Sequence, residues 1–131
     1  MGSSVPPTRP VVLVVEDQPL LRMDAVDVVE MAGLEAVEAA DADEAVRILE
    51  NRLDIRIVFT DIDMPGGVDG MKLAASIRSR WPPIEIIITS GKNKPGAEAI
   101  PARGVFFEKP YKREELAEAI RRLAREGQAS R

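Results

Sequence analysis

Polar and charged side chains follow the main apolar segments of this sequence, at the points where those segments end. They are an acidic pair, a single aspartate, two hydroxyls and an ammonium group: Glu16, Asp17, Asp61, Thr89, Ser90 and Lys109. If the apolar segments are parallel strands, these side chains meet at the carboxyl edge of one sheet. An all-oxygen set of carboxylates without imidazole or thiolate selects a hard cation such as Mg²⁺, or Mn²⁺ in its place. Because Mg²⁺ prefers one or two carboxylates together with a phosphate oxygen, the sequence predicts a site for a phosphoryl group.

These groups have distinct roles in phosphoryl transfer. An aspartate carboxylate can attack phosphorus to form an acyl phosphate, and the charge on the phosphoryl oxygens then needs a metal, a lysine and a hydroxyl nearby. Asp61 is the best placed nucleophile, because its strand is expected between the other strands that contribute to the site. We expect the acidic pair to hold the metal, Lys109 to pair with one phosphoryl oxygen, and Ser90 or Thr89 to donate a hydrogen bond to another.

The composition excludes several other chemistries. The 131 residues include no cysteine and no histidine, which excludes disulfides, Cys/His zinc sites, cysteine nucleophiles and Ser-His-Asp triads. It also excludes a histidine in this sequence that could carry a phosphoryl group. The formal net charge of −4 disfavours nucleic acid as a partner. The longest apolar runs are far shorter than the roughly 20 residues of a membrane span, so no membrane association and a cytoplasmic location are expected.

Strand-like and helical segments alternate along the chain. Strands are predicted at residues 11–15, 34–39, 55–60, 84–89 and 105–107, with helical spacing of apolar residues between them. Such alternation implies a parallel sheet covered by helices on both faces. The partly polar second strand and the short fifth strand suit the edges, which predicts a flavodoxin-like, doubly wound α/β fold with strand order 2-1-3-4-5. Residues 91–103 carry little apolar surface, so a shortened or irregular fourth helix is expected there.

One domain is expected, at residues 10–125, with a disordered leader at 1–9 and a frayed tail at 126–131. The spacing of apolar residues in the first two helices places Leu21 and Leu53 among the residues that face the core.

Four motifs follow one another in order along the chain. They are the acidic pair after VVLVV, FTDIDMP leading to DG, IITSG, and FEKP. With these motifs, residues 10–125 resemble the receiver domain of two-component response regulators. The resemblance implies a stand-alone signalling protein that is no enzyme beyond catalysing its own phosphorylation and dephosphorylation. It also implies a histidine kinase or histidine phosphotransfer protein as the phosphoryl donor, and an unidentified protein as the downstream partner.

The resemblance assigns roles at the site. Asp61 is implied as the phosphoacceptor, and Glu16, Asp17, Asp61 and the backbone carbonyl of Asp63 are implied around Mg²⁺. The side chain of Asp63 is expected to face solvent. Lys109 is implied as the lysine that pairs with the phosphoryl group.

Two further residues are implied as switch residues. In the family the conserved hydroxyl precedes a small residue, which selects Ser90, before Gly91, over Thr89. Phe106 occupies the place of the family's switch aromatic, three residues before the lysine. The Lys109-Pro110 peptide bond is expected to be cis, as is common in the family.

The sequence departs from the family pattern in two places. The loop after Asp61 is one residue longer than the common pattern, and the interval between Ser90 and Lys109 is shorter than usual. The shorter interval affects the helix that contributes to the dimer face of many receivers. We therefore expect a monomer or a weak dimer.

Other functions remain as alternatives. Asp61-Ile62-Asp63 also matches the DxD motif of haloacid-dehalogenase-type phosphatases, although Pro65 stands where those enzymes have Thr or Val. A toprim-type nucleic-acid domain combines an upstream glutamate with DxD, and the net acidity disfavours it. A receiver that acts as an unphosphorylated scaffold is the last alternative.

Overall fold

Aliphatic and β-branched runs form the centre of a five-stranded parallel sheet. The computed structural model describes residues 10–63, 69–91, 100 and 104–129. The central strands are buried along almost their whole length, as a sheet covered on both faces requires. The strand order β2-β1-β3-β4-β5, with every pair parallel, confirms the predicted fold. The strands are β1 (Val11–Val15), β2 (Glu35–Ala39), β3 (Ile55–Asp61), β4 (Glu85–Ser90) and β5 (Gly104–Glu108).

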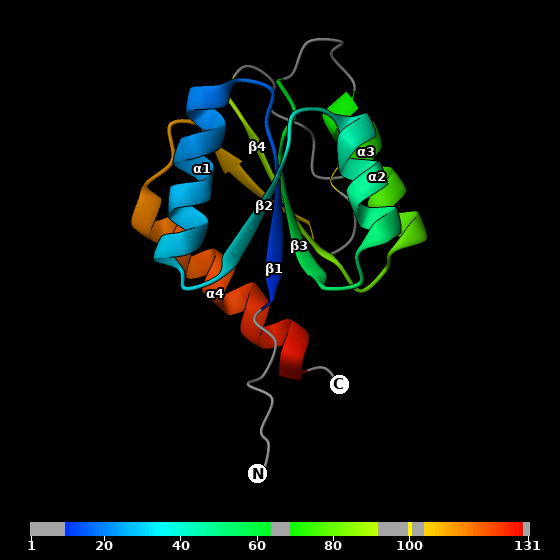
Figure 1. Ribbon diagram of the computed structural model, residues 1–131. Helices are drawn as coiled ribbons and strands as arrows, with labels where there is room; N and C mark the ends of the chain where they lie inside the picture. Colours follow the sequence, from blue (N-terminus) through cyan, green and yellow to red (C-terminus); the bar gives the residue numbers. More distant parts are fainter. Residues whose placement is uncertain (1–9, 64–68, 92–99, 101–103, 130–131) are drawn as a thin grey trace.

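Helices cover both faces of this sheet and enclose a separate core on each. α1 and α4 lie on one face, and α2 and α3 lie on the other (Figure 1). Adjacent residues of β4 pack into different cores, since Ile87 lies on the α1 and α4 side and Ile88 on the α2 and α3 side. The helices are α1 (Pro19–Met31), α2 (Ala42–Asn51), α3 (Asp69–Arg80) and α4 (Arg113–Ala129).

Local sequence signals explain where the first two helices begin and end. Pro19 occupies the first turn of α1, and Gly33 follows that helix with φ 88°, a conformation that favours glycine. At the start of α2, a carboxylate oxygen of Asp41 accepts a hydrogen bond from the backbone N–H of Glu44 (2.8 Å). The Glu44 carboxylate in turn accepts one from the backbone N–H of Ala40 (2.7 Å), the residue before the N-cap, so the start of the helix is held from both sides.

Four expectations about the helices and the terminal segments have the following outcomes. Leu21 is 41% exposed and Leu53 is 93% exposed, so the prediction that both face the core is wrong. α2 ends at Asn51 and the backbone at Arg52 is extended, which removes Leu53 from the helical phase. The fourth helix expected at 91–103 falls almost entirely outside the described residues, as does the leader at 1–9. α4 continues to Ala129, within the segment that was expected to fray.

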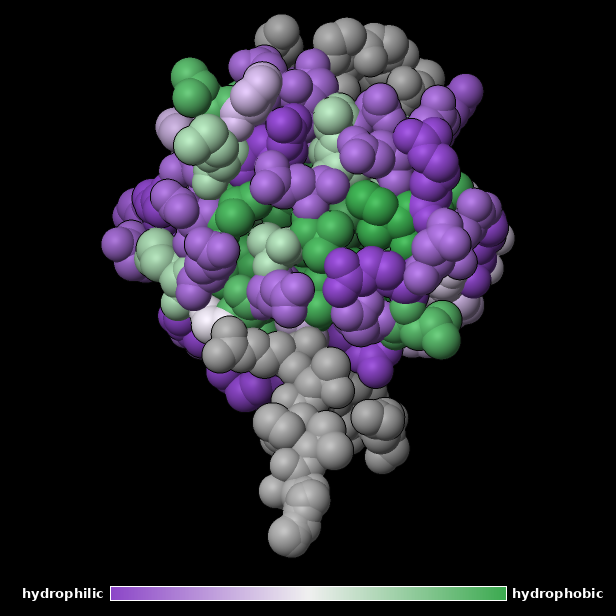
Figure 2. All heavy atoms as spheres, viewed as in Figure 1, coloured by the Kyte–Doolittle hydropathy of each residue, from purple (hydrophilic) through white to green (hydrophobic). Residues whose placement is uncertain are grey.

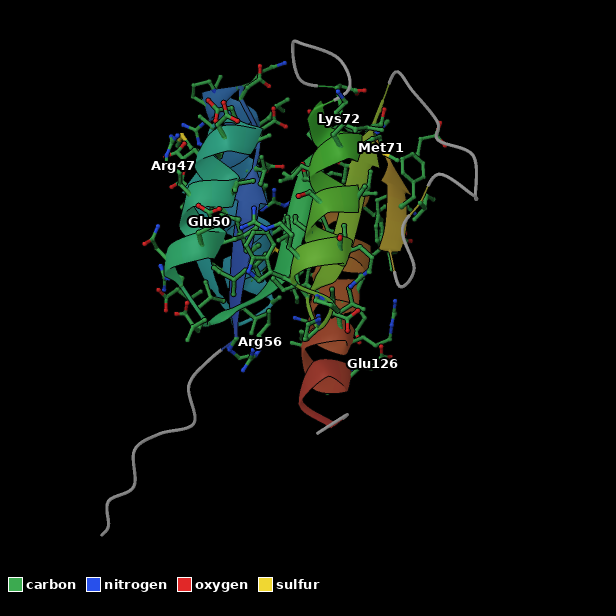
Figure 3. All side chains as sticks on the ribbon, turned by 90° about the vertical axis from the view of Figure 1, so that its right-hand side faces the viewer. Arg47, Glu50, Arg56, Met71, Lys72 and Glu126 are labelled. Atoms are coloured by element: carbon green, nitrogen blue, oxygen red, sulfur yellow. The ribbon has the colours of Figure 1, made fainter. Side chains whose placement is uncertain are left out.

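The two edges of the sheet have different surroundings. The strands end at the upper edge in Figure 1, whereas the start of β1 and the end of α4 lie at the lower edge. Figure 3 shows the same division, because Met71 and Lys72 lie at the upper edge and Arg56 and Glu126 at the lower one. The groups expected to react are therefore at the end of the molecule opposite to these two chain ends.

The surface over the helices is mostly polar, although Leu20 and Met23 of α1 are exposed. Figure 2 shows hydrophilic residues over much of α1 and α2, apolar residues near the start of α1, and a band of apolar residues between the helices, over the edge strand β2. Ala36 and Val37 of this strand are half-buried. No helix in the described part of the chain combines the length and hydrophobicity that a membrane span requires.

Candidate functional site

Asp61 lies at the centre of the carboxyl edge of the sheet. It is the last residue of β3, which runs between β1 and β4, and it is 4% exposed. One carboxylate oxygen accepts a hydrogen bond from the backbone N–H of Asp63 (3.0 Å), and the other lies 3.1 Å from Nζ of Lys109. The backbone N–H of Lys109 donates to the carbonyl of Ser90 (2.9 Å), which anchors the lysine beside the end of β4.

The start of α3 lies directly against the backbone that carries Asp61. A Cβ atom at Gly70 would lie 2.7 Å from Cα of Ile62 and 2.8 Å from the carbonyl oxygen of Asp61. Real Cβ atoms do not approach other atoms this closely, so only glycine permits this contact. The DG that follows the DIDMP motif therefore has a steric role in the site.

An acidic cluster adjoins Asp61. Glu16, Asp17 and Asp61 each offer a carboxylate oxygen, and these oxygens lie within 4.8 Å of one another. Nζ of Lys109 is 3.8 Å from a carboxylate oxygen of Glu16, so one ammonium group faces two of the three carboxylates. One oxygen of Asp17 is buried without a hydrogen-bond partner among the described residues.

Burial changes the acidity of Glu16. It raises the pKa of the Glu16 carboxyl to about 7, and the nearby charge of Asp61 acts in the same direction. The backbone N–H of Gln18, which donates to Glu16 (3.1 Å), and the charge of Lys109 lower that pKa. Burial therefore outweighs the stabilisation that Gln18 and Lys109 give to the charged form of Glu16.

The donor set fits a hard divalent cation. Three carboxylates converge, no imidazole or thiolate is present, and the buried Asp17 oxygen lacks a hydrogen-bond donor among the described residues. A buried charged oxygen without a partner is costly, and a coordinated cation would remove that cost. This supports the expectation that Glu16, Asp17 and Asp61 hold Mg²⁺.

The end of β4 contains the two hydroxyls. Thr89 is a buried strand residue whose carbonyl accepts a hydrogen bond from the backbone N–H of Ile62 (3.0 Å). Ser90, which is 1% exposed, donates its hydroxyl to a carboxylate oxygen of Asp63 (2.7 Å). The other oxygen of Asp63 accepts from the backbone N–H of Gly91 (2.8 Å).

The expectation that the Asp63 side chain faces solvent is therefore wrong. The carboxylate turns toward the end of β4 and is held there by two donors. The sequence signal for this contact is weak, because it consists only of a carboxylate two residues after Asp61 and a hydroxyl followed by glycine on the next strand.

Two expectations concern the β5 end of the site. The Lys109-Pro110 peptide bond is cis, as predicted. Phe106 is half-buried and packs against the core on the α2 and α3 side, and its role as a switch residue stays a prediction.

A hollow next to Asp61 was not anticipated. It has a volume of about 500 Å³ and lies between α1 and the segment that follows β5. Leu21, Phe59 and Tyr111 contribute to its wall, and Asp61 and Lys109 border it. The exposure of Leu21 follows from this hollow, since no described side chain fills the space next to it.

Comparison with known proteins decides the family. The sequence profile of the response regulator receiver domain matches residues 12–121. The chain belongs to this family. Receiver domains are the signalling phosphoacceptor domains of two-component systems, and the acidic cluster lies where such a domain binds Mg²⁺.

Two curated relatives illustrate where such receiver domains occur. The positive alginate biosynthesis regulatory protein of Pseudomonas aeruginosa is 33% identical over 118 residues, which are 87% of this chain and 47% of that protein. The sensor kinase CckA of Brucella abortus is 33% identical over 116 residues, 86% of this chain and 12% of that protein. This receiver domain thus spans less than half the length of either relative.

Solved structures agree with the fold. A receiver domain protein from Clostridium thermocellum has a TM-score of 0.83 at 25% identity, with 93% of this chain and 99% of that chain covered. The response regulator TrrA from Thermotoga maritima, solved in complex with Mg²⁺-BeF, has a TM-score of 0.77 at 25% identity. That comparison covers 87% of this receiver domain and 98% of TrrA.

Proposed function

We propose that this receiver domain accepts a phosphoryl group on Asp61, in a Mg²⁺-dependent reaction, from a phosphohistidine of a histidine kinase or phosphotransfer protein. The observation that carries the proposal is the position of Asp61. It lies 3.1 Å from the ammonium of Lys109 and within an acidic cluster that includes a buried, unpartnered oxygen of Asp17. A nucleophile, a phosphoryl-binding cation and a metal site thus meet at one point.

The transfer assigns a task to each group. The bond between phosphorus and the donor imidazole nitrogen breaks, a bond to a carboxylate oxygen of Asp61 forms, and the imidazole leaves with its electron pair. Glu16, Asp17, Asp61 and the carbonyl of Asp63 would hold Mg²⁺, which would supply positive charge next to the phosphoryl oxygens. Lys109 pairs with one of these oxygens, and Ser90 donates its hydroxyl to another. Since this sequence contains no histidine, the donor histidine lies outside it.

The phosphorylated state then signals to a protein partner through a change in conformation. Ser90 and Phe106 lie on the paired strands β4 and β5, two residues apart in register, since Ile88 pairs with Phe106 and Ser90 with Glu108. A hydroxyl drawn toward the phosphoryl group would shift the end of β4, and Phe106 would follow through packing. In this proposal Ser90 and Phe106 are the switch residues.

The geometry disfavours the phosphatase alternative. The Asp63 carboxylate accepts hydrogen bonds from Ser90 and Gly91, so it is engaged within the protein, and Pro65 stands where such phosphatases have Thr or Val. No observation on the described residues favours this reading over the receiver function.

The test uses beryllofluoride, which mimics a phosphoryl group, and acetyl phosphate as a donor, each with Mg²⁺. Wild-type protein should bind beryllofluoride in calorimetry and become phosphorylated by acetyl phosphate, and Asp61→Asn should do neither. Asp43→Asn, the same substitution at an exposed position on α2, should behave as wild type. Failure of the wild type with both reagents would contradict the proposal and favour an unphosphorylated scaffold.

A further inference from the structure

The Asp63 carboxylate links two neighbouring strand ends. Its two oxygens accept hydrogen bonds from the Ser90 hydroxyl (2.7 Å) and from the backbone N–H of Gly91 (2.8 Å), both at the end of β4. The backbone N–H of the same residue donates to a carboxylate oxygen of Asp61 (3.0 Å). Asp63 therefore connects the proposed phosphoacceptor to the hydroxyl that is proposed to contact the phosphoryl group.

The Ser90 hydroxyl cannot serve both groups at once. A serine hydroxyl has a single hydrogen to donate, and here that hydrogen bond is charge-assisted and short. Ser90 is 1% exposed, so water cannot easily take the place of the Asp63 carboxylate as its hydrogen-bond partner. A hydrogen bond from Ser90 to a phosphoryl oxygen on Asp61 therefore requires that Asp63 releases the hydroxyl.

The electrostatics act in the same direction. A phosphoryl group adds about −1.5 to −2 charge, next to a carboxylate whose own backbone N–H is bonded to Asp61. The carboxylate and the phosphoryl group are both acceptors, and they compete for the donors at the end of β4. The Ser90 carbonyl also accepts from the backbone N–H of Lys109, so a shift at Ser90 reaches the lysine as well.

We propose that Asp63 is a positioning residue whose carboxylate holds the Ser90 hydroxyl and the end of β4 in the unphosphorylated arrangement. The inference rests on the proposed function, because it concerns the rearrangement that follows phosphorylation. Breaking the hydrogen bond between Asp63 and Ser90 reduces the net free energy with which a phosphoryl group binds. Its carboxylate therefore opposes the switch, while its backbone groups support the site.

The side chain can be removed while the hydrogen bond from the Asp63 backbone N–H to Asp61 remains. We would titrate wild type, Asp63→Ala and Asp63→Asn with beryllofluoride at saturating Mg²⁺ in a calorimeter, with Asp43→Ala as an exposed control. Asp63→Ala should bind beryllofluoride roughly tenfold more tightly than wild type, since a charge-assisted hydrogen bond no longer has to be broken. Asp63→Asn, which keeps one acceptor oxygen, should show a smaller gain, and the control should show none.

A double-mutant cycle separates this role from a general effect on folding. Ser90→Ala alone should weaken beryllofluoride binding, because the proposed phosphoryl contact is lost. In the Ser90→Ala background, Asp63→Ala should increase the affinity for beryllofluoride much less than it does in wild type, since no hydroxyl remains to be released. Thermal unfolding of each variant identifies any that fail to fold, and Asp63→Asn, which preserves side-chain size, then carries the test.

Two results would overturn the inference. One is unchanged or weaker beryllofluoride binding in folded Asp63→Ala and Asp63→Asn, and the other is a full gain that persists in the Ser90→Ala background. Either result leaves the proposed function intact as long as wild type binds beryllofluoride through Asp61. Absence of binding in the wild type would instead contradict the proposed function itself.

Discussion

The ammonium nitrogen of Lys109 lies 3.1 Å from a carboxylate oxygen of Asp61, across the end of the strand that separates β3 from β5. The same nitrogen is 3.8 Å from Glu16, so Lys109 holds a position between two buried carboxylates. The lysine thus compensates part of the charge that a metal would compensate.

Replacement of Lys109 by methionine should affect the metal and the phosphoryl group in opposite directions. Mg²⁺ should bind more tightly, by roughly three- to tenfold, because a competing positive charge is removed. Phosphorylation by acetyl phosphate should be slower by about a hundredfold, because a phosphoryl-binding donor is lost. Calorimetry with Mg²⁺ and a gel assay for phosphorylation measure the two effects.

Lys72→Met serves as the control for Lys109, since Lys72 is exposed on α3. It should leave both measurements unchanged. A decrease in both Mg²⁺ affinity and phosphorylation in Lys109→Met would show that the lysine acts through the structure of the site and not through its charge.

Asp17→Asn should weaken Mg²⁺ binding by at least about tenfold, because a coordinating charge is lost. Without metal the same variant should be more stable than wild type, by up to about 1 kcal/mol. The reason is that the substitution removes the charge from a buried Asp17 oxygen, which has no hydrogen-bond partner among the described residues. Thermal unfolding with and without Mg²⁺ tests both statements. A variant that is less stable in both conditions would argue against a metal role for Asp17.

Gly70→Ala should destabilise the protein, although glycine to alanine within a helix normally stabilises by about 0.5–1 kcal/mol. The new Cβ would overlap the backbone of Ile62 and Asp61, and relief of that overlap should cost about 1–3 kcal/mol. Urea unfolding gives the free energy. Ser79→Ala, at an exposed position of the same helix, is the control and should be neutral or slightly stabilising.

Tyr111 provides a spectroscopic test of the packing beside the hollow, because it is the only tyrosine in the sequence. Burial, followed by the charge of Asp24, raises the pKa of its phenol to about 12. The phenol of the unfolded chain titrates near pH 10, so the folded state binds the proton more tightly between these values. This contribution to stability is complete below about pH 10 and is lost as the pH rises toward 12, by up to about 2 kcal/mol.

The phenolate absorbance of the folded protein gives the pKa of Tyr111 directly. Tyr111→Phe should lose less stability than wild type between pH 10 and 12, because no phenol titrates at this position. The lysines titrate in both proteins and do not affect the difference. A midpoint near 10 in folded wild type would show that the ring is solvated and that its packing against Phe59, 6.3 Å between ring centroids, is not maintained.

The strand order and the meeting of the reactive groups could be predicted because both depend on simple patterns. Continuous apolar runs identify buried parallel strands, and the residue after each run lies at one edge of the sheet. Asp61 and Lys109 therefore meet in the structure as expected.

The failures concern features that depend on distant backbone. The direction of the Asp63 carboxylate is set by donors on β4, which local sequence around the DxD motif does not specify. Leu21 has correct helical spacing, yet the chain after β5 leaves a hollow next to it. Leu53 follows a helix end at Asn51 that no glycine or proline marks.

The start of β1 and the end of α4 both lie at the edge of the sheet remote from Asp61 (Figure 1). An affinity handle at either end would therefore orient immobilised molecules on a sensor chip with the acidic cluster toward the flowing buffer. A kinase binding to such a surface would meet a uniformly presented face, so association rates could be read without interference from the attachment chemistry.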